Sequence, residues 1–346
     1  MTKPSGNGKA VNRILIVGLG SIGSRYVRII RELYPHIAIA VLRHQGCGDG
    51  KAAALGISDC FTTIDDALEF SPDAAVIANP SPMHLAVALP LAKEGVHLLV
   101  EKPISSSIDG VRQLIDTCVE QEAKLMTGYN LRFLTTLIRF REYLNQGKVG
   151  QVLSVRAEVG QYLPTWRPES DYRKTVSAQK KLGGGVLLEL SHEIDYLLWL
   201  FGKVEWVKAS VLQQSSLEVD VEDAAHLQVG FKRDAAGRQL LALLNMDFVR
   251  HDTTRQCVVI GEKGTLRWDG VAGRVDYMAV NDNQWEELCV DKPERDFTYR
   301  QELKHFFSCI KTGVTPSVTG EDGRAVLLVV DAARLSSETG QAVLLN

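Results

Sequence analysis

The sequence lacks paired cysteines, long apolar runs and an excess of charge of either sign. Its 6 cysteines are scattered without a C-x-x-C pair, which argues against a zinc knuckle or a disulfide framework and predicts reduced thiols. The 39 basic and 42 acidic residues leave a net charge of -3, so nucleic acid and membrane surfaces are not expected partners. The longest weakly charged stretch, Ala74–Ala92, is interrupted by prolines, which argues against a membrane span. We therefore expect a cytoplasmic protein that binds no metal.

Length and hydrophobic pattern together predict two domains of the α/β class. A chain of 346 residues exceeds one typical hydrophobic core. In the first third, short apolar runs alternate with helical patterns, which indicates a doubly wound parallel sheet. Between Val204 and Leu288, strand-like segments follow one another directly, which indicates an α+β domain with a largely antiparallel sheet. Strands of the first sheet are expected at Ile14–Val17, Ile37–Leu42, Ala74–Ile77, Val96–Val100 and Lys124–Thr127.

The expected boundaries are a flexible N-terminus at residues 1–12, a first domain at 13–128 and a second domain at 129–346. The second domain is expected to bind substrate. Its last helix, Gly320–Thr339, is a candidate to pack back on the first domain. Within the second domain, Val186–Phe201 is predicted as one continuous helix.

A glycine-rich turn follows the first predicted strand. Residues 18–23 read Gly-Leu-Gly-Ser-Ile-Gly and lead into an amphipathic helix. In such a turn the first glycine permits the tight bend, the second lets the backbone approach a pyrophosphate, and the third lets the helix pack closely. The helix N-terminus would also attract phosphates. This pattern predicts a dinucleotide-binding Rossmann domain, with a ligand-free glycine turn as the alternative. The expected cofactor contacts are Gly18, Gly20, Ser21, Ile22 and Gly23.

The end of the second strand bears on the choice of cofactor. NAD-selective domains usually carry an acidic residue there, for the ribose 2′-hydroxyl. Here Arg43 follows Leu42. An arginine can accommodate a 2′-phosphate, so Arg43 favours NADP over NAD. The choice stays open, because Arg43 could instead stack on adenine or face solvent.

Two further strand ends supply candidate site residues. Ligands of doubly wound sheets bind beyond the carboxyl ends of the strands, which places Lys102 near the nicotinamide. The alternative for Lys102 is a surface charge. The expected cofactor contacts from these strand ends are Asn79, Pro80, His84, Glu101 and Lys102.

The order of motifs resembles the Gfo/Idh/MocA family, which includes glucose-fructose oxidoreductase and inositol dehydrogenase. The resemblance spans nearly the whole chain. It implies oxidation of a secondary hydroxyl of a sugar, cyclitol or nucleotide sugar, and a homodimer or homotetramer formed through the C-terminal sheet. Lys102 and His192 match the family's catalytic pair. The matching segments are Gly18–Gly23, Asn79–His84, Glu101–Pro103, Gly183–Gly185, His192–Asp195 and Glu321–Gly323.

The sequence departs from the family pattern at one catalytic position. Many members carry an aspartate four residues before the histidine, where this chain has Leu188. Glu189 lies three residues before His192 and would share a face with it on one helix. We expect His192 to exchange the hydroxyl proton, Lys102 to stabilise the developing alkoxide, and Glu189 or Asp195 to orient the imidazole. A helix-capping or core histidine is the alternative.

The substrate contacts are expected near the start of the second domain. The loop at 161–167 is rich in aromatic and basic residues, which suit a sugar face and an anionic group. These residues favour an acidic or nucleotide-linked sugar, and the alternative is an ordinary packed loop. The candidate substrate residues are Asn130, Arg132, Tyr162, Trp166, Arg167 and Asp195. Further positive charge is expected from Arg173, Lys180 and Lys181.

Two other functions remain open at this point. One is a redox-assisted lyase or hydrolase that recycles its cofactor in each turnover. The other is a non-catalytic cofactor-binding sensor, against which the presence of both Lys102 and His192 argues.

Overall fold

The computed structural model describes residues 10–44, 46 and 48–345. The predicted flexible segment at 1–12 falls mostly outside these residues. The chain forms two compact units. Unit 1 comprises Met1–Tyr129 and Thr298–Arg324, and unit 2 comprises Asn130–Phe297 and Ala325–Asn346. The boundary near residue 324 falls inside a helix, α10 (Gly320–Thr339).

Unit 1 is built on sheet A, whose strands in the described residues run parallel in the order β3-β2-β1-β4-β5-β6. This is the strand order of a Rossmann domain, in which the crossing from β1 to β4 creates the ligand-binding crevice. The strands are β1 (Arg13–Val17), β2 (Ala38–Leu42), β3 (Asp59–Phe61), β4 (Ala74–Ile77), β5 (His97–Glu101) and β6 (Leu125–Gly128).

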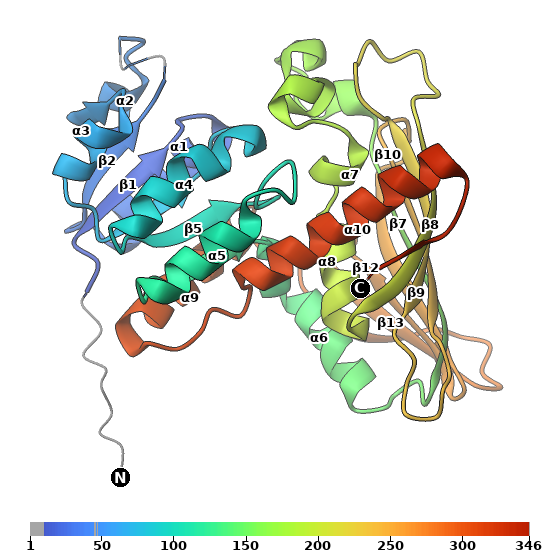
Figure 1. Ribbon diagram of the computed structural model, residues 1–346. Coiled ribbons are helices and arrows are strands. Elements are labelled where there is room, and N and C mark those ends of the chain that lie inside the picture. Colours follow the sequence, from blue (N-terminus) through green and yellow to red (C-terminus); the bar gives the residue numbers. More distant parts are fainter. Residues whose placement is uncertain (1–9, 45, 47, 346) are drawn as a thin grey trace. The chain divides into compact units, whose positions relative to one another are not determined.

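Helices cover sheet A, and α4 and α5 lie side by side over it (Figure 1). The central strand β4 is buried at every position, as expected for a parallel sheet with helices on both faces. The helices of unit 1 before residue 130 are α1 (Ser21–Leu33), α2 (Lys51–Ala54), α3 (Ile64–Glu69), η1 (Ser81–Met83), α4 (His84–Lys93) and α5 (Val111–Glu120).

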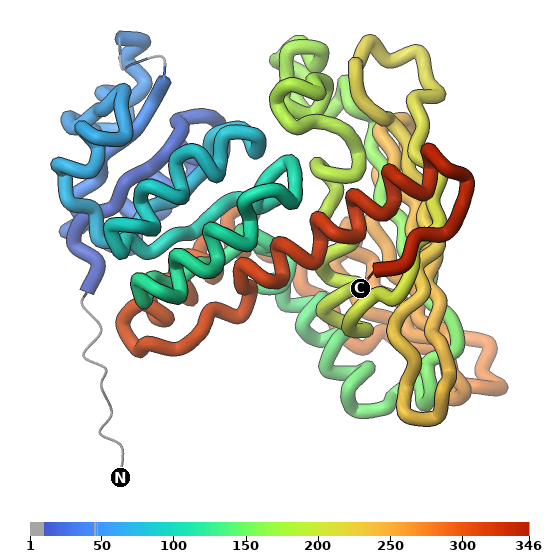
Figure 2. Tube along the Cα trace, viewed as in Figure 1, coloured from blue at the N-terminus to red at the C-terminus, as the bar shows by residue number. Residues whose placement is uncertain are grey.

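One helix returns to unit 1 from late in the chain. This helix, α9 (Phe297–Thr312), is drawn in orange-red at the lower left of Figure 2, among the elements of unit 1. Tyr26 of α1 lies against Glu302 of α9, and Arg300 of α9 pairs with Glu32 of α1. The first residues of α10 also pack on unit 1, because a Cβ at Gly323 would lie 2.7 Å from Oγ1 of Thr127. The return to unit 1 is therefore made by α9 and the start of α10.

Unit 2 is built on sheet B, which is mixed but mostly antiparallel. Its strand order in the described residues is β14-β13-β12-β11-β7-β10-β9-β8-β15, and only the pair of β7 and β10 is parallel. Burial alternates along β10, so one face of the sheet is packed and the other is open. The strands are β7 (Val152–Gly160), β8 (Val204–Leu212), β9 (Ala224–Phe231), β10 (Leu241–Asp247), β11 (Thr254–Gly261), β12 (Gly264–Asp269), β13 (Arg274–Ala279), β14 (Glu286–Val290) and β15 (Val343–Leu344).

The remaining helices of unit 2 include several single turns between β7 and β8. The longer ones are α6, which packs on β12 and β13, and α8, which packs on β7. The bounds are η2 (Asn130–Phe133), α6 (Thr135–Asn145), η3 (Leu163–Thr165), η4 (Tyr172–Lys174), η5 (Val176–Ala178), η6 (Lys180–Leu182), α7 (Val186–Glu189) and α8 (His192–Phe201).

Two expectations from the sequence are wrong. The helix predicted at Val186–Phe201 is broken by a turn at Leu190 and Ser191, which separates α7 from α8. The tight turn is closed by the N–H of Glu193, which donates to the carbonyl oxygen of Leu190. Cys60 is disulfide-bonded rather than reduced, whereas Cys118, Cys257, Cys289 and Cys309 are free.

Candidate functional site

The glycine-rich turn joins β1 to α1 at the crossover point of sheet A. Gly18 has a φ of +86°, and a Cβ there would lie 2.9 Å from the backbone nitrogen of Asn79. A Cβ at Gly23 would lie 2.0 Å from the carbonyl oxygen of Gly18. Both glycines are therefore required by the backbone itself, the first for its left-handed conformation and the second for close packing.

Gly20 differs from Gly18 and Gly23 because the space around it is open. A Cβ there would meet no atom within 4 Å among the described residues. Gly20 also precedes the first turn of α1, which includes Ser21 and Ile22 and whose N-terminus no side chain caps in the part of the chain that is described. Unfilled space beside the positive end of a helix is what a bound pyrophosphate requires. The turn thus fits a dinucleotide.

Arg43, at the end of β2, is held by an acidic side chain. Its Nη1 and Nη2 donate to the two carboxylate oxygens of Asp49 over 2.7 and 2.8 Å. This bidentate contact holds the pKa of the Asp49 carboxyl well below its usual range. The side chain of Arg43 is 10% exposed and that of Asp49 is 40% exposed. A 2′-phosphate would therefore have to compete with Asp49 for the guanidinium.

The end of β4 brings Asn79, Pro80 and His84 together. Nε2 of His84 lies 2.8 Å from the carbonyl oxygen of Asn79, and its Nδ1 lies 3.3 Å from that of Ile104. Burial lowers the pKa of His84, and its ring lies between the carbonyl oxygens of two loops. Oδ1 of Asn79 is buried and has no hydrogen-bond partner among the described residues. This oxygen is an acceptor that a cofactor could fill.

The end of β5 positions Lys102. The backbone N–H of Lys102 donates to Oε2 of Glu101 over 3.1 Å. Glu101 is itself buried, and burial raises the pKa of its carboxyl. The glutamate therefore holds the main chain of Lys102.

In unit 2, His192 and Glu189 lie on opposite sides of the turn between α7 and α8. Glu189 ends α7, and its Oε2 accepts a hydrogen bond from Oγ of Ser177 over 2.6 Å. His192 begins α8 and is partly buried. The sequence pattern predicted one continuous helix for these two residues, but the structure places them on two separate helices.

A small pocket gathers part of the predicted substrate loop. It is lined by Leu163, Trp166, Arg167, Tyr172, Thr175 and Ser177. Ser177 connects this pocket to Glu189 through the hydrogen bond described above. Trp166 is held in place because its indole N–H donates to the carbonyl oxygen of Gln161 and its ring packs edge-on against Phe248. An aromatic ring, a guanidinium and hydroxyl groups are therefore combined at one site.

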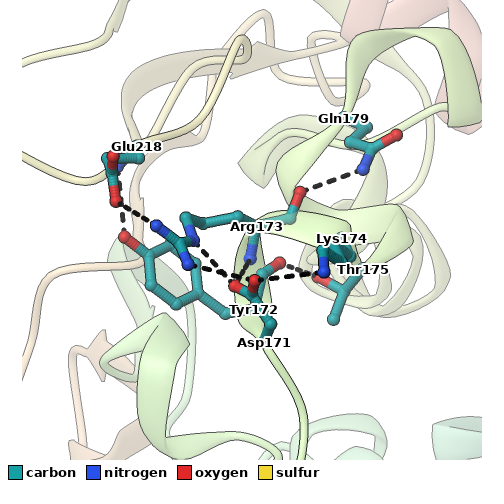
Figure 3. A network of polar contacts seen from close by, with 7 residues as sticks. All are labelled: Asp171, Tyr172, Arg173, Lys174, Thr175, Gln179 and Glu218. Atoms are coloured by element: carbon teal, nitrogen blue, oxygen red, sulfur yellow. Dashed lines mark hydrogen bonds and ion pairs between the residues drawn. The ribbon is translucent and has the colours of Figure 1, made fainter.

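The charge of Arg173, expected next to this pocket, is balanced by acidic side chains. Arg173 donates to both oxygens of Asp171 and to Glu218, as Figure 3 shows. Lys174 lies 3.8 Å from the same aspartate. The main-chain N–H of Lys180 donates to Asp220. Arg167, in contrast, contributes its charge to the pocket itself.

The four other predicted substrate residues, Asn130, Arg132, Tyr162 and Asp195, lie inside unit 2. The guanidinium of Arg132 donates to both oxygens of Asp195, over 2.9 and 2.6 Å, and this ion pair is almost fully buried. Asn130 is also buried, beside Arg132 on η2. The ring of Tyr162 lies 4.5 Å from that of His251. These contacts shape the unit around η2, α8 and β10.

Sequence reasoning missed several residues that support the site. Ser177 and Asp49 were not candidates, because a serine or an aspartate in a loop carries no signal without its partner. The glycines that precede α7 have a steric role. A Cβ at Gly184 would lie 2.4 Å from the carbonyl oxygen of Val176.

The described residues contain no cluster of three or more His, Cys, Asp or Glu side chains suited to a metal ion. No helix within the described ranges is both long and apolar enough to cross a membrane.

The fold and the glycine turn define a nicotinamide-dependent oxidoreductase with a Rossmann domain. Residues 12–129 match the Gfo/Idh/MocA oxidoreductase family in its NAD-binding Rossmann fold, and residues 141–345 match its C-terminal alpha/beta domain. The chain belongs to this family. The resemblance noted in the sequence is thereby confirmed, together with the predicted fold class and the enzymatic function.

Relatives with known names share the full length of the chain. Myo-inositol 2-dehydrogenase of Thermotoga maritima is 26% identical over 350 residues, which cover 96% of this chain and 98% of the relative. D-xylose 1-dehydrogenase (NADP(+)) 2 of Haloferax volcanii is 25% identical and covers 96% of this chain and 99% of its own. The WlbA dehydrogenase of Bordetella pertussis, solved with NADH and UDP-GlcNAcA, has a TM-score of 0.79 at 22% identity and covers 98% of this chain and 99% of its own.

Proposed function

We propose that this protein transfers hydride between a nicotinamide cofactor and a secondary hydroxyl or ketone of a sugar, and that this sugar is acidic or nucleotide-linked. The observation that carries the proposal is the pocket of unit 2, where Arg167 and Trp166 lie together. A guanidinium binds carboxylate or phosphate groups, and an indole ring packs on a sugar face. The dehydrogenase names of the relatives support the sugar class.

The reaction needs an acceptor for hydride and a group that takes the hydroxyl proton. The nicotinamide ring supplies the hydride acceptor when it is bound. We assign the proton to His192, because an imidazole exchanges protons near neutral pH. Lys102 holds the hydroxyl and stabilises the negative charge that develops on its oxygen. Glu189, held by Ser177, is the third candidate catalytic residue.

Each cofactor contact predicted from the sequence keeps its role in this proposal. Gly20 and the start of α1 take the pyrophosphate, and Asn79 offers its free oxygen. Arg43 is the candidate contact for a 2′-phosphate, so NADP remains possible beside NAD. The pairing of Arg43 with Asp49 favours NAD in the native chain.

Absorbance of the reduced nicotinamide tests the function directly. The protein is mixed with NAD or NADP and a panel containing myo-inositol, neutral aldoses, uronic acids and nucleotide-linked uronic acids. We expect the highest kcat/KM for an acidic or nucleotide-linked sugar, and loss of turnover in K102A and H192A. Net production of reduced cofactor separates this reaction from a lyase that recycles it.

Arg167→Ala tests the substrate class, with Arg139→Ala as the matched control. Arg139 is an exposed arginine of the same unit, paired with Glu142. R167A should raise KM for acidic sugars roughly tenfold or more, because a charge-assisted contact is lost, and should leave neutral sugars unaffected. An unchanged KM for acidic sugars in R167A would exclude them as the preferred class.

We further propose a homodimer or homotetramer that forms through sheet B. Its open face exposes Leu153, Leu241 and Leu243, which are 54%, 37% and 48% exposed. Exposed apolar side chains gathered on a sheet are typical of a surface that another chain covers. A cytoplasmic location remains a prediction.

A further inference from the structure

In unit 1, Tyr26 and Glu302 are buried titratable side chains that have no role in the function proposed so far, and both contact Glu101. Oη of Tyr26 on α1 lies 3.1 Å from Oε1 of Glu101 and 2.6 Å from Oε2 of Glu302 on α9. Tyr26 and Glu302 are 0% exposed, and Glu101 is 8% exposed. These three residues, the Tyr26 cluster, join α1, the end of β5 and α9.

The geometry of the Tyr26 cluster requires an additional proton. A phenol carries one proton and can donate it to only one carboxylate. Were both glutamates ionised, the second would place a buried negative charge against the lone pairs of the phenol oxygen. With one glutamate protonated, its O–H donates to Oη of Tyr26 while Tyr26 donates to the other. The three facing atoms, Oη of Tyr26, Oε1 of Glu101 and Oε2 of Glu302, then each take part in a hydrogen bond.

The surroundings show which glutamate carries this proton. Glu101 accepts the backbone N–H of Lys102, and the charges of Lys102 and Arg25 favour its ionised form. Glu302 lies against Tyr26 and Glu101, and its Oε1 has no hydrogen-bond partner among the described residues. The remaining titratable neighbour is Tyr299 of α9, whose ring packs edge-on against Tyr26 and under the guanidinium of Arg25. Burial and the charge of Glu101 raise the pKa of Glu302 well above its usual range.

The cluster connects α9 to Lys102 through a chain of contacts. Glu302 contacts Tyr26, Tyr26 contacts Glu101, and Oε2 of Glu101 accepts the N–H of Lys102. Gly128 of β6 leaves room for this carboxylate, because a Cβ there would lie 3.2 Å from Oε2 of Glu101. The main chain at Lys102 is therefore linked, through Glu101 and Tyr26, to Glu302, which comes 200 residues later in the sequence.

We infer that Glu302 is a positioning residue for the proposed reaction. Its protonated carboxyl orients Tyr26, which fixes the carboxylate of Glu101 and with it the backbone of Lys102. This role rests on the proposed function only in so far as Lys102 is catalytic. The protonation and the hold on Lys102 are properties of unit 1 and can be measured without a substrate.

The first measurement is the ionisation state of Glu302. The protein is labelled with ¹³C at the glutamate carboxyl carbons, and the resonance that disappears in E302Q is assigned to Glu302. We expect this resonance at the position of a neutral carboxylic acid at pH 7. A resonance at the carboxylate position would overturn the inference.

The second measurement is the rate at which an amine-reactive reagent modifies Lys102, followed by peptide mass spectrometry. E302L and Y26F break the chain of contacts, whereas E302Q keeps an uncharged group of the same shape. E32Q is the matched control, because Glu32 joins the same two helices at the surface. We expect the rate to change about fivefold or more in E302L and Y26F, and to stay within about twofold in E302Q and E32Q.

An unchanged labelling rate in Y26F and in folded E302L would contradict the positioning role. If E302L fails to fold, Y26F alone decides the question. With an active sugar substrate, both variants should also lose kcat roughly tenfold while the Kd for NADH stays constant. A wild-type protein that binds NADH but oxidises no sugar would remove the proposed function, and the labelling result would still stand or fall by itself.

Discussion

Individual side chains in this protein are often explained by one partner that the sequence does not place beside them. Arg43 is paired with Asp49 and Arg132 with Asp195. A charged residue that looks available for a ligand can therefore already be neutralised. The consequence differs with burial, since the pair of Arg132 and Asp195 is enclosed whereas Asp49 is partly open to water.

Asp49→Asn should shift the cofactor preference toward NADP. The substitution removes the negative charge that competes with a 2′-phosphate for the guanidinium of Arg43. We expect the Kd for NADPH to fall roughly fivefold and the Kd for NADH to change little, because exposed ion pairs are individually weak. Fluorescence titration with both reduced cofactors measures this effect.

The double variant R43A/D49N provides the control. Without Arg43, the gain in NADPH affinity should disappear. Equal NADPH affinity in the wild type and D49N would show that Asp49 does not influence the choice of cofactor.

Glu302→Gln should flatten the dependence of stability on pH. The folded chain keeps a proton on Glu302 that the unfolded chain releases near the ordinary pKa of 4.5. Above that pH the folded state binds more protons than the unfolded state, so wild-type stability falls as pH rises toward the raised pKa. E302Q carries no such proton, and its loss of unfolding free energy between about pH 5 and pH 8 should be smaller by about 1–3 kcal/mol.

Urea denaturation of the wild type, E302Q and E32Q at about pH 5 and pH 8 measures this change in unfolding free energy. E32Q should follow the wild type, because Glu32 is exposed and titrates differently from a buried group. Parallel pH profiles for the wild type and E302Q would mean that Glu302 is ionised in the folded protein.

At the scale of elements, the glycines in the turn between β1 and α1 have two different roles, one in packing and one in leaving open space. Gly23 is needed for packing, because a Cβ at this position would overlap the carbonyl oxygen of Gly18. Gly20 has a φ of -74°, which any residue can adopt, and open space around it. The protein alone thus explains Gly18 and Gly23 but not Gly20, for which a bound pyrophosphate is the reason that we propose.

The paired variants G20A and G23A test this separation. G20A should fold with wild-type stability and weaken NADH binding about tenfold or more, since its methyl group enters the space for the pyrophosphate. G23A should lose about 1–3 kcal/mol of unfolding free energy from the overlap. Thermal denaturation and NADH titration of both variants provide the two readouts. Wild-type NADH affinity in G20A would be incompatible with a pyrophosphate at this turn.

The break between α7 and α8 shows where a sequence pattern loses resolution. Val186, Leu187, Leu188 and Leu190 are all buried. A nearly continuous apolar run fits a helix in any register, so it contains no signal for a turn at Leu190. The inference that Glu189 and His192 share one helix face therefore failed, although each remains a candidate catalytic residue.

At the scale of the whole molecule, the open face of sheet B is the feature that bears on assembly. Leu243→Lys should convert the proposed oligomer to monomers, because a charge buried in an apolar interface is strongly unfavourable. Light scattering coupled to size-exclusion chromatography measures the mass. Val119→Lys is the control, since Val119 is 73% exposed on α5 of unit 1. An unchanged mass in L243K would place any interface elsewhere.

Short-range pattern was enough to predict the Rossmann domain, the second sheet and the family. A glycine turn between a buried strand and a helix is a local signal, and parallel strands buried on both faces produce runs that need no knowledge of distant residues. The confirmed parts of the prediction are of this kind. We could also predict that the carboxyl ends of β1, β4 and β5 lie close together, because strand order in such a sheet determines which strand ends are neighbours.

Only the folded chain revealed which charges are already paired and which helix supports Lys102. The contact of Glu302 with Tyr26 spans 276 residues, and that of Arg132 with Asp195 spans 63. No local pattern encodes such separations, because a buried ion pair or shared proton depends on the two segments being brought together by packing. The tertiary structure therefore showed which distant residue each of these side chains contacts, and residue type alone does not give that information.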